Sequence, residues 1–319
     1  MSQIVANNYH SFNQSTTINN ISDDESKIHA WLSPLDPRLR HQDLRFQRMD
    51  SVGAWLLETR EFKSWYGDGG GDVPDHAALF CDGNPGVGKS YITLDRVSLR
   101  INQGMALLTN CDLSSLVIDK LCDEAIGQDT AVTCFYFDYA ARKEQSPINI
   151  LGSLLKQLAG RFKPIPDEIV KEFENQRTVI GGRGLQISEI LKMFRTIATE
   201  VRTFICIDAL DECAPEHRVV VLDSLAQILR ESPNTRMFMT GRSHVRREIK
   251  WRLGGAAVFI SIEPTEDDVL GYLRERLRND TSPEIMDSTL EVDIMKTILE
   301  ASSETYVEET MRKLLEGTF

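Results

Sequence analysis

Residues 80–95 read FCDGNPGVGKSYITLD, and this stretch decides the fold of the chain. It overlaps the short apolar run AALFC at 77–81, which predicts a buried strand. Residues 83–90 fit the spacing G-x-x-x-x-G-K-[ST], directly after a predicted strand as this motif requires. Glycines at these positions let backbone N–H groups turn inward around phosphate oxygens, and a helix that begins there adds positive potential. The stretch therefore predicts a phosphate-binding loop.

The side chains of this loop divide between phosphate and metal. We expect Lys89 at the β- and γ-phosphates, and the hydroxyl of Ser90 at a Mg²⁺ ion. The other nucleotide-binding positions of the loop are Gly83, Asn84, Pro85, Gly86, Val87 and Gly88. A nucleoside triphosphate or diphosphate with Mg²⁺ is thus the predicted ligand.

A second motif, TFICIDALDE at 203–212, supplies carboxylates. Asp208 ends an apolar strand, where a Mg²⁺-binding carboxylate would emerge at the sheet edge beside the phosphate loop. We assign Asp208 to Mg²⁺ through water, and Asp211 or Glu212 to orienting and activating the attacking water. The alternative is an ordinary solvated loop.

A third motif, RMFMTGRS at 236–243, is another strand that ends in polar residues. Arg242 would lie beside the carboxylate strand, within reach of a γ-phosphate. A lone arginine after a strand can equally be a surface cation, so this role stays open.

Apolar runs alternate with amphipathic stretches through the middle of the chain. The predicted strands are 77–81, 133–137, 203–207, 236–240 and 257–262. Helical spacing of apolar residues lies between them, as at Leu151, Leu154, Leu155 and Leu158. Apolar strands that alternate with such helices predict an α/β fold, a P-loop NTPase with a five-stranded, mainly parallel sheet covered on both faces.

The chain divides into four expected regions. Residues 1–34 are polar and read as a disordered tail, although Asn-rich segments can also pair as β-structure between chains. Residues 35–76 read as a helical segment and loop before the NTPase domain, which we place at 77–262. Residues 263–319 have a helical pattern and read as the start of a truncated helical domain.

Composition limits the partners and the location. The net charge of −12 argues against nucleic-acid binding, because such binding uses Lys/Arg surfaces; HVRREIKWR at 244–252 is the one basic stretch, and we read it as a solvated helix face. No apolar run approaches the ~20 residues of a membrane span, and the N-terminus does not have the pattern of a secretory signal. The six cysteines form no CxxC pair, which is typical of reduced thiols. We therefore expect a cytoplasmic protein without a nucleic-acid partner.

The motifs GNPGVGKS, ICIDALDEC and MFMTGRS, in that order, resemble the NACHT branch of the STAND P-loop ATPases, and above all the fungal NOD-like receptors. The flanking stretches over roughly 35–280 are similar to that family's nephrocystin-3-like N-terminal region. The resemblance implies a switch that is closed with ADP, and open and homo- or hetero-oligomeric with ATP. It also implies a preference for adenine and a role in self/non-self or immune-like signalling.

The chain departs from that family in its surroundings. Family members usually carry an N-terminal effector and C-terminal ankyrin, WD40 or TPR repeats. Here only the polar tail precedes the NTPase region, and the residues after 280 leave no room for a full helical domain or repeats. We therefore expect a truncated architecture.

The stretch after Ser90 is a further departure. A helix should continue there, but DRVSLRIN alternates with period two, and QGMALLTNCD contains turn formers. Without residues 94–114 the chain would read GKSYITSLVIDKLCDEA, in which Leu116, Val117 and Leu121 fall one and two turns after Ile92, on one helix face. We interpret 94–114 as an insertion, such as a retained intron; the alternative is a genuine longer helix.

Three functions follow from these observations. The leading one is a signalling ATPase that binds ATP with Mg²⁺, hydrolyses it slowly and uses occupancy to change shape or assembly. The second is a non-catalytic fragment that co-assembles with full-length relatives. The third is a small-molecule kinase, for which neither an arginine-rich lid nor an acceptor pocket is visible in the sequence.

Overall fold

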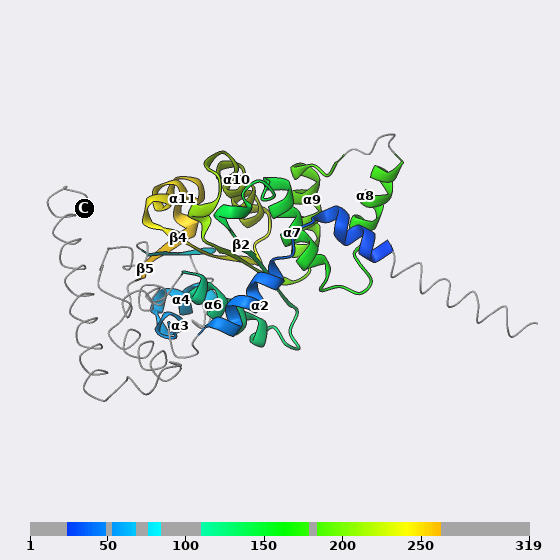
Figure 1. Cartoon of the computed structure of the whole chain (residues 1–319). Helices are drawn as coiled ribbons and strands as arrows, with labels where there is room; N and C mark the ends of the chain where they lie inside the picture. The colour runs from blue at the N-terminus through cyan, green and yellow to red at the C-terminus, as the bar shows by residue number, and fades with distance from the viewer. Residues whose placement is uncertain (1–23, 49–52, 68–75, 84–109, 179–183, 263–319) are drawn as a thin grey trace, which may run out of the picture.

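A five-stranded sheet forms the centre of the molecule (Figure 1). The computed structural model describes residues 24–48, 53–67, 76–83, 110–178 and 184–262. The strands are β1 (Ala78–Gly83), β2 (Thr130–Tyr136), β3 (Arg202–Asp208), β4 (Thr235–Arg242) and β5 (Ala257–Ile262). All neighbouring strands are parallel, in the order β2-β3-β4-β1-β5. The predicted α/β fold with five parallel strands is confirmed.

Each strand contributes side chains to both faces of the sheet, because successive residues of a strand point in opposite directions. In β3, Ile205 and Ile207 belong to one buried apolar cluster, and Phe204 and Cys206 belong to a second cluster on the other face. Strands buried on both faces read as continuous apolar runs. This explains why all five were visible in the sequence.

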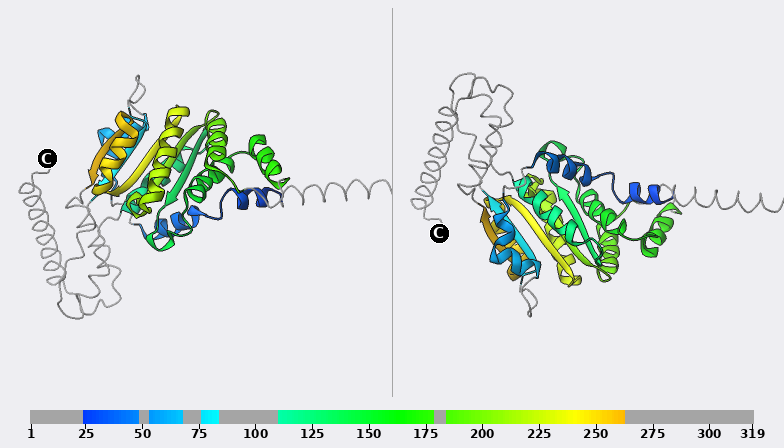
Figure 2. Two further views of the ribbon diagram at one scale, coloured as in Figure 1. Left: turned by 90° about the horizontal axis from the view of Figure 1, so that it is seen from above. Right: turned by 90° about the horizontal axis from the view of Figure 1, so that it is seen from below.

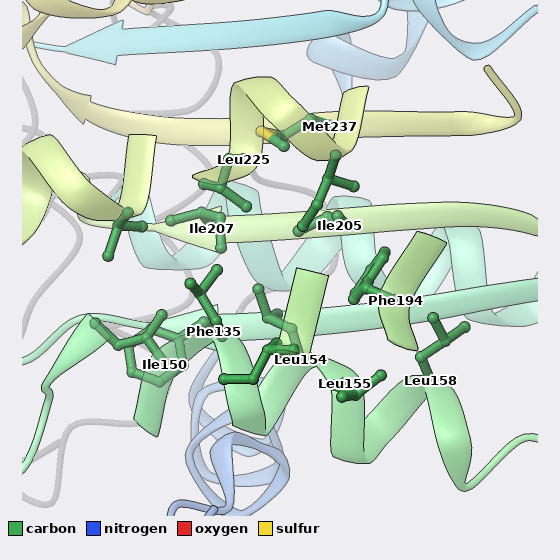
Figure 3. Packing of buried hydrophobic residues seen from close by; sticks show 14 of the residues in the cluster. Phe135, Ile150, Leu154, Leu155, Leu158, Phe194, Ile205, Ile207, Leu225 and Met237 are labelled. Carbon is green, nitrogen blue, oxygen red and sulfur yellow. The ribbon is translucent and has the colours of Figure 1, made fainter. Parts of the chain in front are cut away.

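The first face is covered by helices that follow β2, β3 and β4 in the sequence (Figures 1 and 2). They are α7 (Pro147–Ala159), α9 (Ile187–Ala198), α10 (Pro215–Glu231) and α11 (Arg246–Leu253), with α8 (Asp167–Arg177) lying further out. The hydroxyl of Ser146 accepts a hydrogen bond from the N–H of Asn149 and so caps the start of α7, where Pro147 suits the first turn. Figure 3 shows Leu154 of α7 in the same cluster as Phe135 of β2 and Phe194 of α9.

The second face is covered by helices that come before and after β1 in the sequence. They are α2 (Pro37–Gln47), α3 (Trp55–Glu58), α4 (Arg60–Tyr66) and α6 (Asn110–Glu124). Trp65 of α4 is fully buried, and its ring centroid lies 5.6 Å from that of Phe204 and 6.0 Å from that of Phe238. The segment before β1 is therefore part of the same body as the sheet.

The expected disordered tail at 1–34 needs a correction at its C-terminal end. Residues 24–32 form a helix, in which Ile28 and Leu32 are buried in the first cluster. These two residues are four apart and share one helix face, and the neighbouring Trp31 packs edge-on against Phe173 of α8. The polar composition of the tail hid this short apolar stripe. Residues 1–23 lie outside the described residues.

Helix α6 bears on the interpretation of 94–114 as an insertion. Residues 94–109 lie outside the described residues, but 110–114 form the first turn of α6. Leu113, Val117 and Leu121 are all buried against the sheet, so the helix that packs beside β3 and β4 begins within the stretch in question. The rival stripe at 91–101 and the expected helical domain at 263–319 also lie outside the described residues.

Candidate nucleotide site

The carboxyl ends of three neighbouring strands bring the predicted site residues to one edge of the sheet. Asp208 ends β3, Arg242 ends β4 and Gly83 ends β1. Because β4 lies between β3 and β1, these two strands are two strand spacings apart, roughly 10 Å, and Asp208 lies level with Thr240 and Cys81, two residues before Gly83. Gly83 pairs in register with Arg242. In parallel α/β sheets this edge is where ligands bind.

Only the first residue of the predicted phosphate loop is described. Gly83 is buried at the end of β1, so the strand leads directly into the loop sequence. The other loop positions lie outside the described residues: Asn84, Pro85, Gly86, Val87, Gly88, Lys89 and Ser90. Their roles stay predictions.

Asp208 is almost fully buried and is held by two hydroxyl groups. Its Oδ1 accepts hydrogen bonds from the Oγ of Ser114 at 2.5 Å and from the Oγ1 of Thr240 at 2.7 Å. Thr240 Oγ1 also accepts the backbone N–H of Ala209 at 3.1 Å. Thr240 thus fixes both the carboxylate and the turn that follows it.

That turn is tight, and it places two further carboxylates. Ala209 has φ 53°, in the left-handed region that residues other than glycine rarely adopt. The short 3₁₀ helix η2 (Leu210–Glu212) follows, anchored by the fully buried Leu210. Asp211 and Glu212 therefore leave the strand end in a fixed conformation.

Asp211 is paired with Arg242. The Nε of Arg242 lies 3.1 Å from Asp211 Oδ2, and the backbone N–H of Arg242 donates to Oδ1 at 3.1 Å. A Cβ on the neighbouring Gly241 would come within 3.3 Å of Val245 Cγ2, which is tight, and within 3.4 Å of Asp211 Oδ1 and of the Phe80 ring, so this position has little room for a larger residue. The sequence placed Arg242 near a γ-phosphate; in this structure its guanidinium, which is partly exposed, is on Asp211.

Glu212 lies in an environment that suits a general base. Burial raises the pKa of its carboxyl, and the nearby Asp211, Asp138 and Asp208 add to this, while the hydrogen bond from the Tyr139 N–H opposes it. That N–H donates to Glu212 Oε2 at 3.0 Å. A carboxylate with a raised pKa is better matched to proton transfer near neutral pH.

Sequence reasoning did not find the residues that support these carboxylates. Ser114 lay in the stretch interpreted as an insertion, and Thr240 was read only as the end of an apolar strand. Asp82, one residue before Gly83, is buried and forms an ion pair of 2.7 Å with Arg246 at the start of α11. Burial raises the pKa of Asp82, and Arg246 opposes that shift. An acidic residue directly after an apolar run was the signal available for Asp82.

The oxygen atoms at this edge fit a magnesium ion. Mg²⁺ prefers oxygen ligands, and in nucleotide sites it is usually held by one or two carboxylates together with phosphates and water. Asp208 provides one carboxylate, and the hydroxyls of Ser114 and Thr240 lie beside it. No cluster of three or more His, Cys, Asp or Glu that could hold a metal by protein ligands alone is found in the described part of the chain.

The parallel sheet, the glycine-rich sequence after β1 and the buried carboxylate at the end of β3 define a P-loop NTPase fold, the fold of a class of nucleotide-binding proteins. The family model described as "Nephrocystin 3, N-terminal" matches residues 112–242. The match covers α6 to the end of β4, and therefore includes Asp208, Asp211, Glu212 and Arg242. A search of curated proteins gives no match.

Solved structures of similar fold include three archaeal proteins. The Aeropyrum pernix ORC1 protein in complex with DNA has 17% identity and a TM-score of 0.39, over 80% of this chain and 56% of that protein. The Walker-type ATPase of Pyrococcus abyssi has 11% identity and a TM-score of 0.41, over 80% and 76%. Cdc6p from Pyrobaculum aerophilum has 16% identity and a TM-score of 0.34, over 77% and 52%. The chain thus spans little more than half the length of two of them.

The expectation of no nucleic-acid partner is corrected by this comparison, because the Aeropyrum pernix protein was solved in complex with DNA. The net charge of −12 sums over the whole chain, whereas phosphate contacts depend on cations gathered locally. Arg247 and Lys250 of α11, in the basic stretch at 244–252, are exposed. Total charge was therefore the wrong quantity from which to exclude nucleic acid.

Among the described residues, no helix combines the length and the apolar character that crossing a bilayer requires.

Proposed function

We propose that this chain is a signalling NTPase that binds ATP with Mg²⁺ and hydrolyses it slowly, and that nucleotide occupancy controls its conformation or assembly. The main support is the common edge of the sheet, where β1 leads into the glycine-rich loop two strands away from the buried Asp208. Bound Mg²⁺ would neutralise phosphate charge. Asp208 would hold the metal through water, and Glu212, with its raised pKa, would orient and deprotonate the attacking water.

The NACHT assignment, with its signalling role and fungal immune-like context, is the finer part of this proposal. Its support is the order of the three motifs together with the nephrocystin-3 family match, which ends at Arg242. We also propose a cytoplasmic location. Five described cysteines are free thiols, as expected in a reducing compartment: Cys81, Cys122, Cys134, Cys206 and Cys213.

Nucleotide binding with a lysine variant is the direct test. Lys89→Ala removes the charge expected at the β- and γ-phosphates, so ATP affinity should fall roughly 10- to 100-fold, the worth of one charge-assisted hydrogen bond. Lys171→Ala is the matched control, because Lys171 is an exposed lysine on α8, far from the carboxyl edge. Isothermal titration calorimetry with ATP and Mg²⁺ measures both. Equal affinity of wild type and Lys89→Ala would count against the site.

A second candidate function is that of a non-catalytic fragment which binds nucleotide, or only its own relatives. One observation favours it: the candidate site residues already have partners within the protein. Arg242 is paired with Asp211, and Asp208 accepts hydrogen bonds from two hydroxyl groups. Phosphate release by the purified chain, with Glu212→Gln for comparison, separates the two functions. Binding without any release above that of Glu212→Gln would select the non-catalytic one.

A further inference from the structure

A group of largely buried polar side chains joins α2, and Arg48 directly after it, to α6. Asp119 of α6 is at its centre: His41 Nε2 lies 3.1 Å from Asp119 Oδ1, and Arg48 Nη2 lies 2.8 Å from Oδ2. Only 7% of the Arg48 side chain and 13% of the Asp119 side chain are exposed. A buried ion pair is a weak source of net stability, but removing one partner is costly because the other charge is left buried. Such a pair therefore fixes an arrangement more than it adds stability.

Arg48 also reaches the turn of α6 that contacts the site. Its Nη1 donates to the Oγ of Ser115 at 2.6 Å, and Ser115 is fully buried. The preceding residue, Ser114, donates to Asp208 at 2.5 Å. One guanidinium thus holds α6 at two places, one of them next to the hydroxyl on the predicted metal carboxylate.

His41 makes a second connection from α2 toward Asp208, through β2. Its Nδ1 lies 2.8 Å from the hydroxyl of Tyr136, which ends β2 and pairs in register with Asp208. Burial lowers the pKa of His41, and although Asp119 acts in the opposite direction, Arg45 and Arg48 add to the lowering. A neutral ring that donates from Nε2 to Asp119 and accepts the Tyr136 hydroxyl proton at Nδ1 satisfies both contacts.

We propose that Arg48 is a positioning residue of the nucleotide site: it holds the turn of α6 that carries Ser114 and Ser115, so that Ser114 stays on Asp208, and it thereby couples α2 to the predicted metal-binding carboxylate. A displacement of α2 would then move Ser114 relative to Asp208. The effect that we expect on the Mg²⁺ dependence of ATP binding rests on the proposed function, whereas the positioning of α6 does not.

The test compares Arg48→Ala with Arg45→Ala in the full chain. Arg45 is a matched control: it has the same charge, lies in α2 and faces the same carboxylate, at 3.7 Å from Asp119 Oδ2, but its side chain is 64% exposed. In Arg48→Ala, amide hydrogen exchange of residues 114–118 should rise about tenfold relative to that of α9, the effect of losing hydrogen bonds that hold one turn. The Mg²⁺ concentration for half-maximal ATP binding should rise several-fold, while affinity measured in EDTA stays unchanged. Arg45→Ala should change neither by more than about twofold.

Two further variants keep the test decisive. Ser115→Ala removes one contact of Arg48 and leaves the ion pair, so it should show a smaller change of the same kind. Arg48→Lys keeps the charge but lacks the planar fork. It should fold as the wild type does, but amide exchange at 114–118 should stay faster than in the wild type. Faster exchange throughout the chain, or no change in α6, would overturn the inference. If wild type binds no nucleotide, the proposed function fails, and the exchange data still decide whether Arg48 positions α6.

Discussion

At the scale of single residues, the site depends on how one buried carboxylate is held. The sequence predicted Asp208 and Arg242 at strand ends, with Asp211 and Glu212 shortly after Asp208, because polar residues after apolar runs are visible in the sequence. The hydroxyls on Asp208 were not predictable in the same way. Ser114 reaches it from another element, and a contact across 94 sequence positions has no local pattern.

Thr240→Val tests how much this hydroxyl contributes. Valine has the same shape, but it cannot donate to Asp208 or accept the Ala209 N–H, so two buried polar groups lose a partner. The free energy of unfolding should fall by about 1–3 kcal/mol. Urea denaturation followed by circular dichroism measures it. Thr240→Ser keeps the hydroxyl and should lose less than Thr240→Val; equal losses would show that packing of the methyl group, and not the hydrogen bonds, matters at this position.

At the scale of elements, α6 lies where the helix after the phosphate loop was expected. It packs on β3 and β4 through Leu113 and Val117, yet 26 residues, 84–109, separate its first residue from the end of β1. The sequence indicated that a helix should be found beside the sheet, and apolar spacing from 116 onward predicted its face. Where it begins could not be predicted, because the period-two pattern of DRVSLRIN gives no helix start.

Deleting residues 94–114 tests the insertion, which stays a proposal. The deletion would put Ile92 in the place of Leu113 and Thr93 in the place of Ser114, so both the buried apolar contact and the hydroxyl near Asp208 would be kept. We expect the shortened chain to unfold at the same temperature as the full chain or higher, and to bind ATP more tightly.

The control for this deletion removes 94–113 instead. It shifts the register by one residue, which turns the preceding helix by about 100° and puts Thr93 in the place of the buried Leu113. This variant should be less stable than the other deletion. If the two deletions have the same melting temperature and ATP affinity, the register argument is wrong.

At the scale of the whole molecule, one sheet joins the two apolar clusters. The alternation of apolar strands and helices predicted a parallel sheet covered on both faces, but it predicted no strand order. The position of β4 between β3 and β1 could not be predicted, since crossover connections leave no trace in composition. Charge has the same limit: the net charge of −12 sums over the whole chain and does not show that exposed cations lie together on α11.

Because β3 contributes to both clusters, we expect the two faces to unfold together. Phe194→Ala opens a cavity in the first cluster and Phe204→Ala opens one in the second, and both rings are almost fully buried. Each should lower the free energy of unfolding by about 3–5 kcal/mol in a single transition. Tryptophan fluorescence and far-ultraviolet circular dichroism should give the same midpoint; separate midpoints in either variant would show that the faces unfold independently.

The free thiols of the sheet provide a way to watch it open. Cys206 lies in the middle of β3, two residues before Asp208, and burial raises its pKa far above the range in which a thiol ionises in water. The thiolate is the form that attacks an alkylating reagent, so Cys206 reacts only when the strand separates from its neighbours. Partial burial, Asp119 and Asp123 raise the pKa of Cys122 as well, but Cys122 is accessible on the surface of α6 and can react without such an event. The alkylation rate of Cys206, compared with that of Cys122, therefore measures how often the sheet opens.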